Sequence, residues 1–144
     1  MNFMSEYNHT VDAKGRMIVP NKFRDDLGVS FVVTRGIEHC LYVYAKSEWQ
    51  AVVDRINSMP RTSSDARQFA RHMLGGATEV EPDGQGRILI PQYLREYAGI
   101  AKEAVLVGMG NYIEVWGKEK YTETTDNVDI EGLANKLNES GIWF

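Results

Sequence analysis

Two short turns carry the residues best suited to bind an anion. The pattern Asp-x-x-Gly-Arg occurs from Asp12 to Arg16 and again from Asp83 to Arg87. An arginine guanidinium is planar and can donate two parallel hydrogen bonds to a phosphate or to the O6 and N7 atoms of guanine. The pattern therefore fits DNA binding, and it fits equally a turn that an internal Asp–Arg pair closes. The residues alone leave both interpretations open.

The other residues of the turns favour close contact with a ligand. Gly15 and Gly86 precede the arginines, and glycine permits a positive φ and a close backbone approach. Lys14 adds a positive charge that suits a phosphate, whereas Gln85, at the matching position of the second turn, is neutral and can hydrogen bond with adenine. The two turns are similar in shape but differ in charge.

An enzymatic interpretation of the same residues is weaker. Asp12 and Asp83 could share a proton, as paired carboxylates do in acid–base hydrolysis. Each aspartate, however, is followed by an arginine that would keep it ionised. The three histidines and the single Cys40 show no metal-ligand spacing, and no phosphate-binding loop is present. We expect no catalytic residue, no metal and no cofactor, and we expect Cys40 to be a small core residue.

The turns belong to an internal repeat. Residues 12–28 resemble residues 83–99, with Asp, Gly, Arg, Pro, Arg and Gly at matching positions, and the similarity continues downstream with one residue of slippage. A module of about 40 residues cannot bury a sufficient core alone. We therefore expect the copies to intertwine into one pseudo-symmetric, β-barrel-like domain. A pseudo-twofold axis would then place Arg16 and Arg87 as a pair on one face.

Each copy has the same predicted elements. A polar strand leads into the turn, a short apolar strand ends at proline, and a short helix ends at Gly28 or Gly99, where a left-handed cap is usual. Two β-rich runs complete the copy. The strands are expected at residues 6–11, 17–19, 31–34 and 41–44, and at residues 78–81, 88–90, 104–107 and 113–116.

Helices are predicted between and after the copies. Ser47 and Gln50 form a capping-box pattern before one apolar stripe, and Ser64 is the expected N-cap of a second helix that stops at glycine. A weaker helix is expected in the tail, whose final Trp143-Phe144 would contact the body or a neighbouring subunit. The expected organisation is a first module at 5–47, a helical connection at 48–75, a second module at 76–119 and an acidic tail at 120–144.

Charge and hydropathy narrow the function classes. From Glu119 onward there are six acidic residues and two lysines, which leaves 14 basic and 14 acidic residues before that point. The body is therefore neutral, and only the local charge at the turns bears on nucleic-acid binding. No apolar stretch is long enough to span a bilayer, and no secretory signal is seen, so we expect a cytoplasmic protein without membrane contact.

The chain resembles the MraZ family of transcriptional regulators. The similarity lies in residues 6–20, 31–36, 65–67, 76–79 and 85–91, in matching order and spacing. It implies a mainly β fold with helices (α+β), in which two AbrB-like modules form a double-split, swapped-hairpin-type barrel. It also implies a ring-shaped homo-oligomer, often an octamer. Such a ring would bind repeated double-stranded DNA elements upstream of the division and cell-wall gene cluster, in the cytoplasm at the nucleoid.

The resemblance also suggests roles for the turn residues. The family's Asp-x-x-x-Arg motif is intact in both copies, which implies DNA contacts by Arg16 and Arg87, with Lys14 and Gln85 beside them. Asp12, Asp83, Gly15 and Gly86 would orient the turns. The alternative is an AbrB-like structural or protein-binding scaffold, similar to an antitoxin, whose arginines bind an acidic protein surface.

Overall fold

The computed structural model describes residues 1–142, which form strands and helices in alternating groups. The strands are β1 (Glu6–Thr10), β2 (Arg16–Ile18), β3 (Phe31–Arg35), β4 (Leu41–Ala45), β5 (Thr78–Val80), β6 (Arg87–Leu89), β7 (Glu103–Gly108) and β8 (Ile113–Gly117). The helices are α1 (Asn21–Leu27), α2 (Lys46–Asn57), α3 (Ser64–Met73), α4 (Gln92–Ala98), α5 (Lys118–Thr125) and α6 (Ile130–Glu139). The expected α+β class is confirmed.

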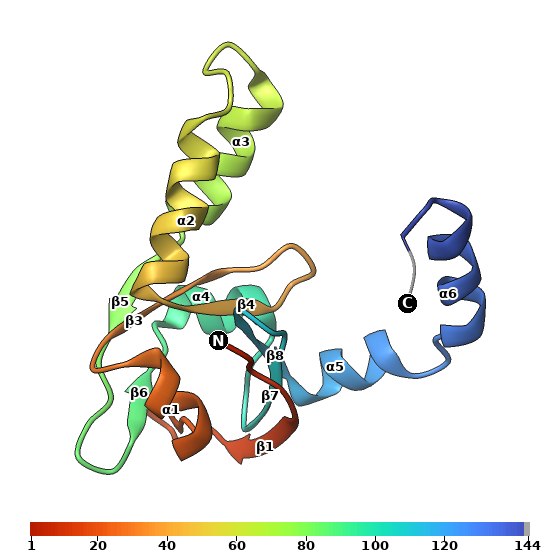
Figure 1. Ribbon diagram of the computed structural model, residues 1–144. Coiled ribbons are helices and arrows are strands. Elements are labelled where there is room, and N and C mark those ends of the chain that lie inside the picture. The colour runs from red at the N-terminus through yellow and green to blue at the C-terminus, as the bar shows by residue number, and fades with distance from the viewer. Residues whose placement is uncertain (143–144) are drawn as a thin grey trace.

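The two repeats exchange strands. The larger sheet has the order β1-β7-β8-β4-β3-β5, so β1 of the first repeat pairs with β7 of the second, and β5 of the second pairs with β3 of the first. The central pair, β4 and β8, consists of equivalent strands. The order therefore reads the same when the repeats are interchanged, as the predicted pseudo-twofold axis requires (Figure 1).

The strands that follow the two turns form a separate antiparallel ribbon. β2 pairs with β6, with Met17 opposite Ile88 at the centre of the register. Backbone hydrogen bonds from Val19 to the Gly86 carbonyl (3.0 Å) and from Ile90 to the Gly15 carbonyl (2.9 Å) extend the pairing into the opposite turn. The expected exchange of strands is thus present. The strands form a six-stranded sheet and this two-stranded ribbon, and no closed barrel of strands is seen in residues 1–142.

Two apolar clusters pack on opposite faces of the large sheet. One cluster joins the sheet to the ribbon and to α1 and α4, and its most buried large side chains include Phe23, Phe31 and Leu94. The other joins the sheet to α2 and α3 through Tyr44, Trp116 and their neighbours. The ribbon is therefore held on the core by its inward side chains, and its outward side chains are left to solvent.

Cys40 lies in the second cluster and is fully buried, as expected for a small core residue. Burial raises the pKa of its thiol to about 12. The thiol is therefore kept neutral and unreactive at physiological pH, because only the thiolate is a nucleophile.

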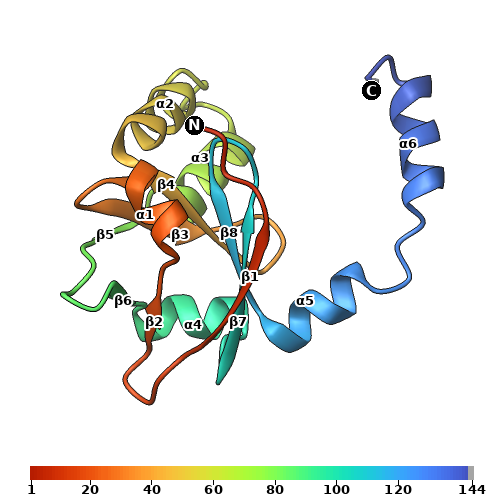
Figure 2. The same ribbon diagram turned by 60° about the horizontal axis from the view of Figure 1, so that its bottom comes forward.

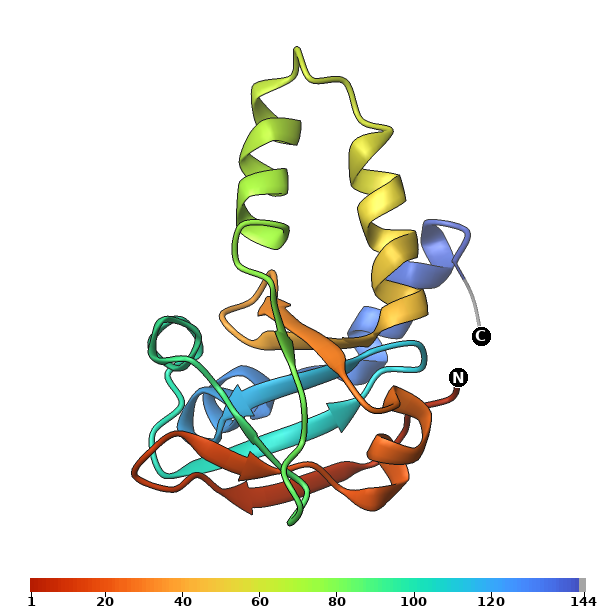
Figure 3. The ribbon, with the colours of Figure 1, turned by 90° about the vertical axis from the view of Figure 1, so that its left-hand side faces the viewer.

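Helices α2 and α3 form a hairpin that projects from the sheet (Figure 3). Their starts differ from the prediction. Helix α2 begins at Lys46, and its N-cap residue is Ala45, so the capping box expected at Ser47 is not formed. The N-cap of α3 is Ser63 rather than Ser64, and the Ser63 hydroxyl accepts a hydrogen bond from the backbone N–H of Ala66 at 3.2 Å.

The helices of the two repeats end at the predicted glycines but with different geometry. Gly99 adopts the left-handed conformation (φ 63°, ψ 33°) after α4, as predicted. Gly28 after α1 also has a positive φ of 88°, but its ψ of −168° places it outside the left-handed helical region, which corrects the expectation at that end. The two short helices thus end with different backbone conformations.

The C-terminal helices extend away from the body (Figures 1 and 2). Tyr121 of α5 contacts Trp116 edge-to-face and donates a hydrogen bond to Glu6, which ties α5 to the sheet. Helix α6 forms as predicted, and none of its residues is buried. Trp143 and Phe144, for which a contact was expected, lie outside the described residues. No helix in residues 1–142 is long and apolar enough to cross a membrane.

Candidate nucleic-acid interface

Asp12 closes the first turn through both of its carboxylate oxygens. Its Oδ1 accepts hydrogen bonds from the backbone N–H groups of Lys14 (3.0 Å) and Arg16 (2.9 Å), and its Oδ2 accepts one from Nε of Arg16 (2.7 Å). The backbone N–H of Gly15 donates to the Asp12 carbonyl at 2.9 Å, and Gly15 has a φ of 89°. A positive φ favours glycine at this position. One carboxylate therefore fixes both the turn and the direction of the arginine.

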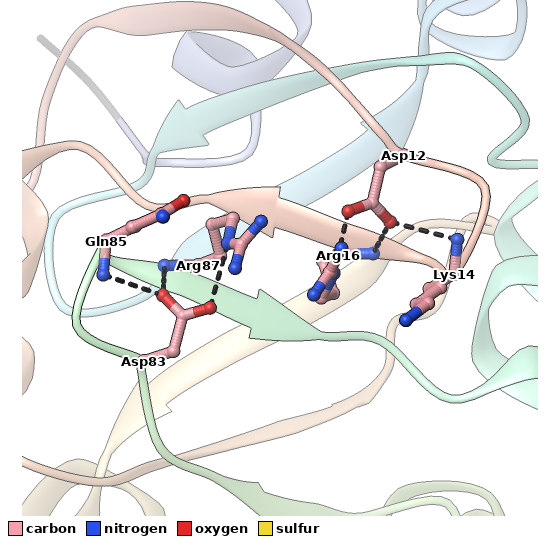
Figure 4. A network of polar contacts seen from close by, with 6 residues as sticks. All are labelled: Asp12, Lys14, Arg16, Asp83, Gln85 and Arg87. Carbon is pink, nitrogen blue, oxygen red and sulfur yellow. Dashed lines mark hydrogen bonds and ion pairs between the residues drawn. The ribbon is translucent and has the colours of Figure 1, made fainter.

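The second turn repeats this geometry. Oδ1 of Asp83 accepts hydrogen bonds from the backbone N–H groups of Gln85 and Arg87, both at 2.9 Å, and Oδ2 accepts one from Nε of Arg87 at 2.8 Å. Gly86 has a φ of 78°. Figure 4 shows the two turns at opposite ends of the ribbon, with both arginines between the aspartates. The difference in sequence between the turns leaves their backbone and ion pairs unchanged.

These hydrogen bonds hold both aspartates in the charged form. The pKa of Asp12 is lowered chiefly by the backbone N–H of Arg16, with a further contribution from its guanidinium, and Arg87 acts on Asp83 in the same way. A dyad that shares a proton would instead raise the pKa of one carboxyl. The geometry therefore gives no support to the acid–base interpretation.

The internal ion pair leaves most of each guanidinium free. Only Nε of Arg16 and of Arg87 is used by its aspartate, and within residues 1–142 neither Nη1 nor Nη2 of these arginines makes a hydrogen bond. Their side chains are 32% and 27% exposed. The two interpretations that the sequence left open are therefore compatible, because the aspartate orients the arginine through Nε and leaves the terminal nitrogens available to a ligand.

Both arginines lie on the outer face of the ribbon. Arg16 is opposite Leu89 and Arg87 is opposite Ile18, while Met17, between Arg16 and Ile18, is buried. Arg16 and Arg87 are therefore diagonal neighbours across an antiparallel pair, a position at which Cα atoms lie about 7–8 Å apart. A two-stranded ribbon of this kind is narrow enough to enter the major groove of DNA.

Lys14 and Gln85 lie at the outer ends of this face. Both are exposed, and neither side chain makes a hydrogen bond within the described part of the chain. Only their backbone N–H groups are used, by Asp12 and Asp83. The sequence-predicted residues are thus brought together along one ribbon face, with a cation at one end and a neutral amide at the other.

Two further arginines, not predicted to be part of the site, cover the glycines of the turns. A methyl group placed on Gly15 would lie 2.6 Å from Cζ of Arg95, and one placed on Gly86 would lie 2.6 Å from Cζ of Arg24. Each guanidinium comes from the helix of the other repeat: Arg95 of α4 covers the first turn, and Arg24 of α1 covers the second. The only sequence signal was that both arginines recur at matching positions of the repeat.

These two arginines are also held in place through Nε. Arg24 donates to the Val19 carbonyl and Arg95 to the Ile90 carbonyl, both at 2.9 Å. Neither forms an ion pair with an acidic residue of the described chain. Four guanidinium groups, two from each repeat, therefore lie along the ribbon and its two turns.

Together, the fold and the site define a strand-exchanged protein of two repeats, whose paired turns carry partly exposed arginines on one ribbon face. Comparison with known proteins identifies the family. The family model described as "MraZ protein, putative antitoxin-like" matches residues 2–72 and 73–140. The chain therefore belongs to the MraZ family, as its sequence suggested.

Curated relatives agree over nearly the whole chain. Proteins named "Transcriptional regulator MraZ" are 47% identical in Clostridium tetani and 48% identical in Clostridium beijerinckii, each over 141 residues, which is 97% of this chain and 99% of the relative. The one from Carboxydothermus hydrogenoformans is 50% identical over 137 residues, 94% of this chain and 96% of the relative. These relatives are named as regulators and the family model describes no enzyme, so the expectation that the chain is not an enzyme is confirmed.

Proposed function

We propose that this protein is a sequence-specific DNA-binding transcriptional regulator that reads double-stranded DNA with the outer face of the β2–β6 ribbon. The observation that carries the proposal is the pair Arg16 and Arg87, which are oriented through Nε on one exposed face and whose Nη atoms make no hydrogen bond within residues 1–142. The name of the relatives, transcriptional regulator, supports the same function.

The chemistry of the site fits recognition of base edges flanked by phosphates. Arg16 and Arg87 would each donate two hydrogen bonds to O6 and N7 of a guanine, the commonest specific contact in the major groove. Lys14 would bind a phosphate, and Gln85 an adenine or a phosphate. Arg24 and Arg95, beside the turns, would add phosphate contacts that position the ribbon without reading sequence.

We further propose that the regulated genes are the division and cell-wall cluster, whose upstream repeats the protein binds at the nucleoid. This assignment rests on the family resemblance. The modules at 5–47 and 76–119 would together form one reading unit, joined by the helical connection at 48–75. The acidic tail at 120–144 would stay away from the DNA, because its net negative charge is repelled by the negative phosphates.

A ring-shaped homo-oligomer would supply the affinity that one subunit lacks. The body of the chain carries no net positive charge, so each subunit makes few electrostatic contacts with DNA. Linked subunits that engage successive repeats bind more tightly, because the second contact benefits from a high effective concentration. Light scattering at micromolar protein concentration should therefore show an oligomer, and a monomer would contradict this part of the proposal.

The function is tested by fluorescence anisotropy with DNA from upstream of the protein's own gene. Wild type should prefer this fragment to shuffled DNA, and binding should weaken as salt rises. The Arg16→Ala/Arg87→Ala variant should lose binding while it keeps its fold by circular dichroism. Arg55→Ala is the matched control, because Arg55 is an exposed arginine on the projecting hairpin, away from the ribbon. A folded double variant that binds as well as wild type would refute the proposal.

The second candidate is a protein-binding scaffold, which the antitoxin-like description of the family favours. In that case the same arginines would bind carboxylates on a partner protein. Equal and weak binding to native and shuffled DNA would favour this candidate over the regulator.

A further inference from the structure

Two large aliphatic side chains lie exposed in the middle of the arginine face. Ile18 is 44% exposed and Leu89 is 55% exposed, although their strand neighbours Met17 and Ile88 are each 1% exposed. The alternation of side chains in a strand explains which residues point outward, but it does not explain why those residues are apolar. A ribbon face that only met water would be expected to carry polar residues there.

The position of these two residues ties them to the arginines. In the β2–β6 register Ile18 is opposite Arg87 and Leu89 is opposite Arg16. Each aliphatic side chain also lies two residues beyond the arginine of its own strand, on the same face. The face is therefore a block of four side chains in which every arginine is beside two aliphatic groups.

Both repeats supply the same arrangement. Ile18 and Leu89 occupy matching positions of the two repeats, each two residues after the arginine and two before the proline. Single exposed aliphatic residues are common on protein surfaces and need no explanation. Here the pair lies at the pseudo-twofold centre of a face whose other members are polar or charged, so a ligand that fits this face must offer apolar groups between its polar ones.

We propose that Ile18 and Leu89 contact the C5-methyl groups of thymines and so make thymine, next to the guanines bound by Arg16 and Arg87, part of the recognised sequence. This inference rests on the proposed function. The thymine methyl is the apolar group that a base pair presents in the major groove, where guanine presents its O6 and N7 acceptors. Arginine and aliphatic side chains side by side on one ribbon match a groove in which guanine and thymine edges are neighbours.

The experiment uses DNA in which every thymine is replaced by deoxyuridine. This change removes the C5-methyl groups and keeps the hydrogen-bonding groups of the bases. The fragment from upstream of the protein's own gene is prepared in both forms, and their affinities for wild type are compared by anisotropy at one salt concentration. The transfer of one methyl group from water is worth about fourfold in affinity, so two contacts predict about 15-fold weaker binding to the deoxyuridine fragment.

Variants separate the contact from a general effect on DNA shape. Ile18→Ala/Leu89→Ala should bind the thymine fragment about 15-fold more weakly than wild type and should no longer distinguish it from the deoxyuridine fragment. Ile37→Ala is the matched control, because Ile37 is 65% exposed in the β3–β4 turn, outside the ribbon. That variant should distinguish the two fragments as wild type does.

The outcomes distinguish this inference from the function on which it rests. If wild type prefers native to shuffled DNA but binds thymine and deoxyuridine fragments equally, the regulator stands and the methyl contact is refuted. The inference is also refuted if the double variant still distinguishes the two fragments. It is refuted likewise if the double variant alters the oligomeric state of the protein and leaves its affinity for both fragments unchanged. If wild type shows no preference for native DNA, the proposed function itself has failed.

Discussion

Replacing Gly15 by alanine should disturb the first turn in two separable ways. Gly15 has a φ of 89°, and its added methyl group would lie 2.6 Å from the guanidinium carbon of Arg95. The positive φ is unfavourable for any residue with a Cβ atom. The close contact must be relieved by movement of Arg95, whose Nε is hydrogen bonded to the Ile90 carbonyl at 2.9 Å.

The magnitude follows from these two effects. A positive φ costs a non-glycine residue about 1–2 kcal/mol. The loss of a partly buried hydrogen bond at Arg95 costs about 0.5–1.5 kcal/mol more. The free energy of unfolding of Gly15→Ala should therefore fall by about 1.5–3.5 kcal/mol, which for a chain of this length lowers Tm by roughly 5–12 °C.

Two other glycines provide controls for urea unfolding at one protein concentration. Gly99 also has a positive φ, of 63°, but an added methyl group would meet no atom within 4 Å, so Gly99→Ala should show only the backbone cost. The reduced freedom of the unfolded chain is common to both variants and cancels in the comparison. Gly84, with open space and no positive φ, should tolerate alanine without loss. Equal destabilisation of Gly15→Ala and Gly99→Ala would refute the contact between Arg95 and the turn.

Three further predictions concern the core and the titratable groups. Phe23 is 2% exposed and meets two aromatic rings edge-to-face, so Phe23→Ala should lower the free energy of unfolding by about 3–5 kcal/mol in urea; a loss under 1 kcal/mol would contradict the packing described. Cys40, with a thiol pKa of about 12, should resist iodoacetamide at pH 8 until the protein is unfolded, and labelling of the folded protein would show that the thiol is accessible. The carboxyl signals of Asp12 and Asp83 in NMR should titrate below the ordinary pKa of 3.8. Their stabilising effect is then complete above pH 3.8 and is lost as pH falls through the lower folded value, and a pKa at or above 3.8 would contradict the closed turns.

Most of the structure that the sequence predicts follows from the internal repeat. Because residues 12–28 and 83–99 match, the sequence predicts equivalent strands, equivalent turns and a pairing of the two copies. The exchange of β1 and β5 between repeats and the ribbon of β2 with β6 agree with this. Whether the strands close into a barrel depends on how the six-stranded sheet packs against the β2–β6 ribbon, and the repeat pattern does not predict this packing.

Local capping signals were less reliable where tertiary structure decides. Strand β4 runs to Ala45 and helix α2 begins at the next residue, so the chain leaves the sheet before the Ser47 pattern can act as a cap. Ser63 and Ser64 are neighbours with the same capping chemistry, and the structure selects the first. The local sequence pattern therefore does not determine where either helix begins.

The parts of the site that were missed depend on contacts between repeats. Asp12 and Arg16 are close in sequence, so their pairing was a foreseeable alternative. The position of Arg95 over Gly15 arises only when the helix of one repeat packs beside the turn of the other. Likewise, the exposure of Leu89 beside Arg16 follows from the ribbon register, which no local pattern reveals.

The most direct test of DNA reading by the ribbon replaces the guanidinium groups of Arg16 and Arg87 with ammonium groups. Arg16→Lys/Arg87→Lys keeps the positive charge but removes the paired donors that read a guanine edge. Anisotropy with native and shuffled upstream DNA should show that this variant binds shuffled DNA about as well as wild type does, while its preference for the native fragment is lost. A lysine variant with the full preference of wild type would show that these arginines serve only as charges, and it would contradict direct reading of DNA by the ribbon.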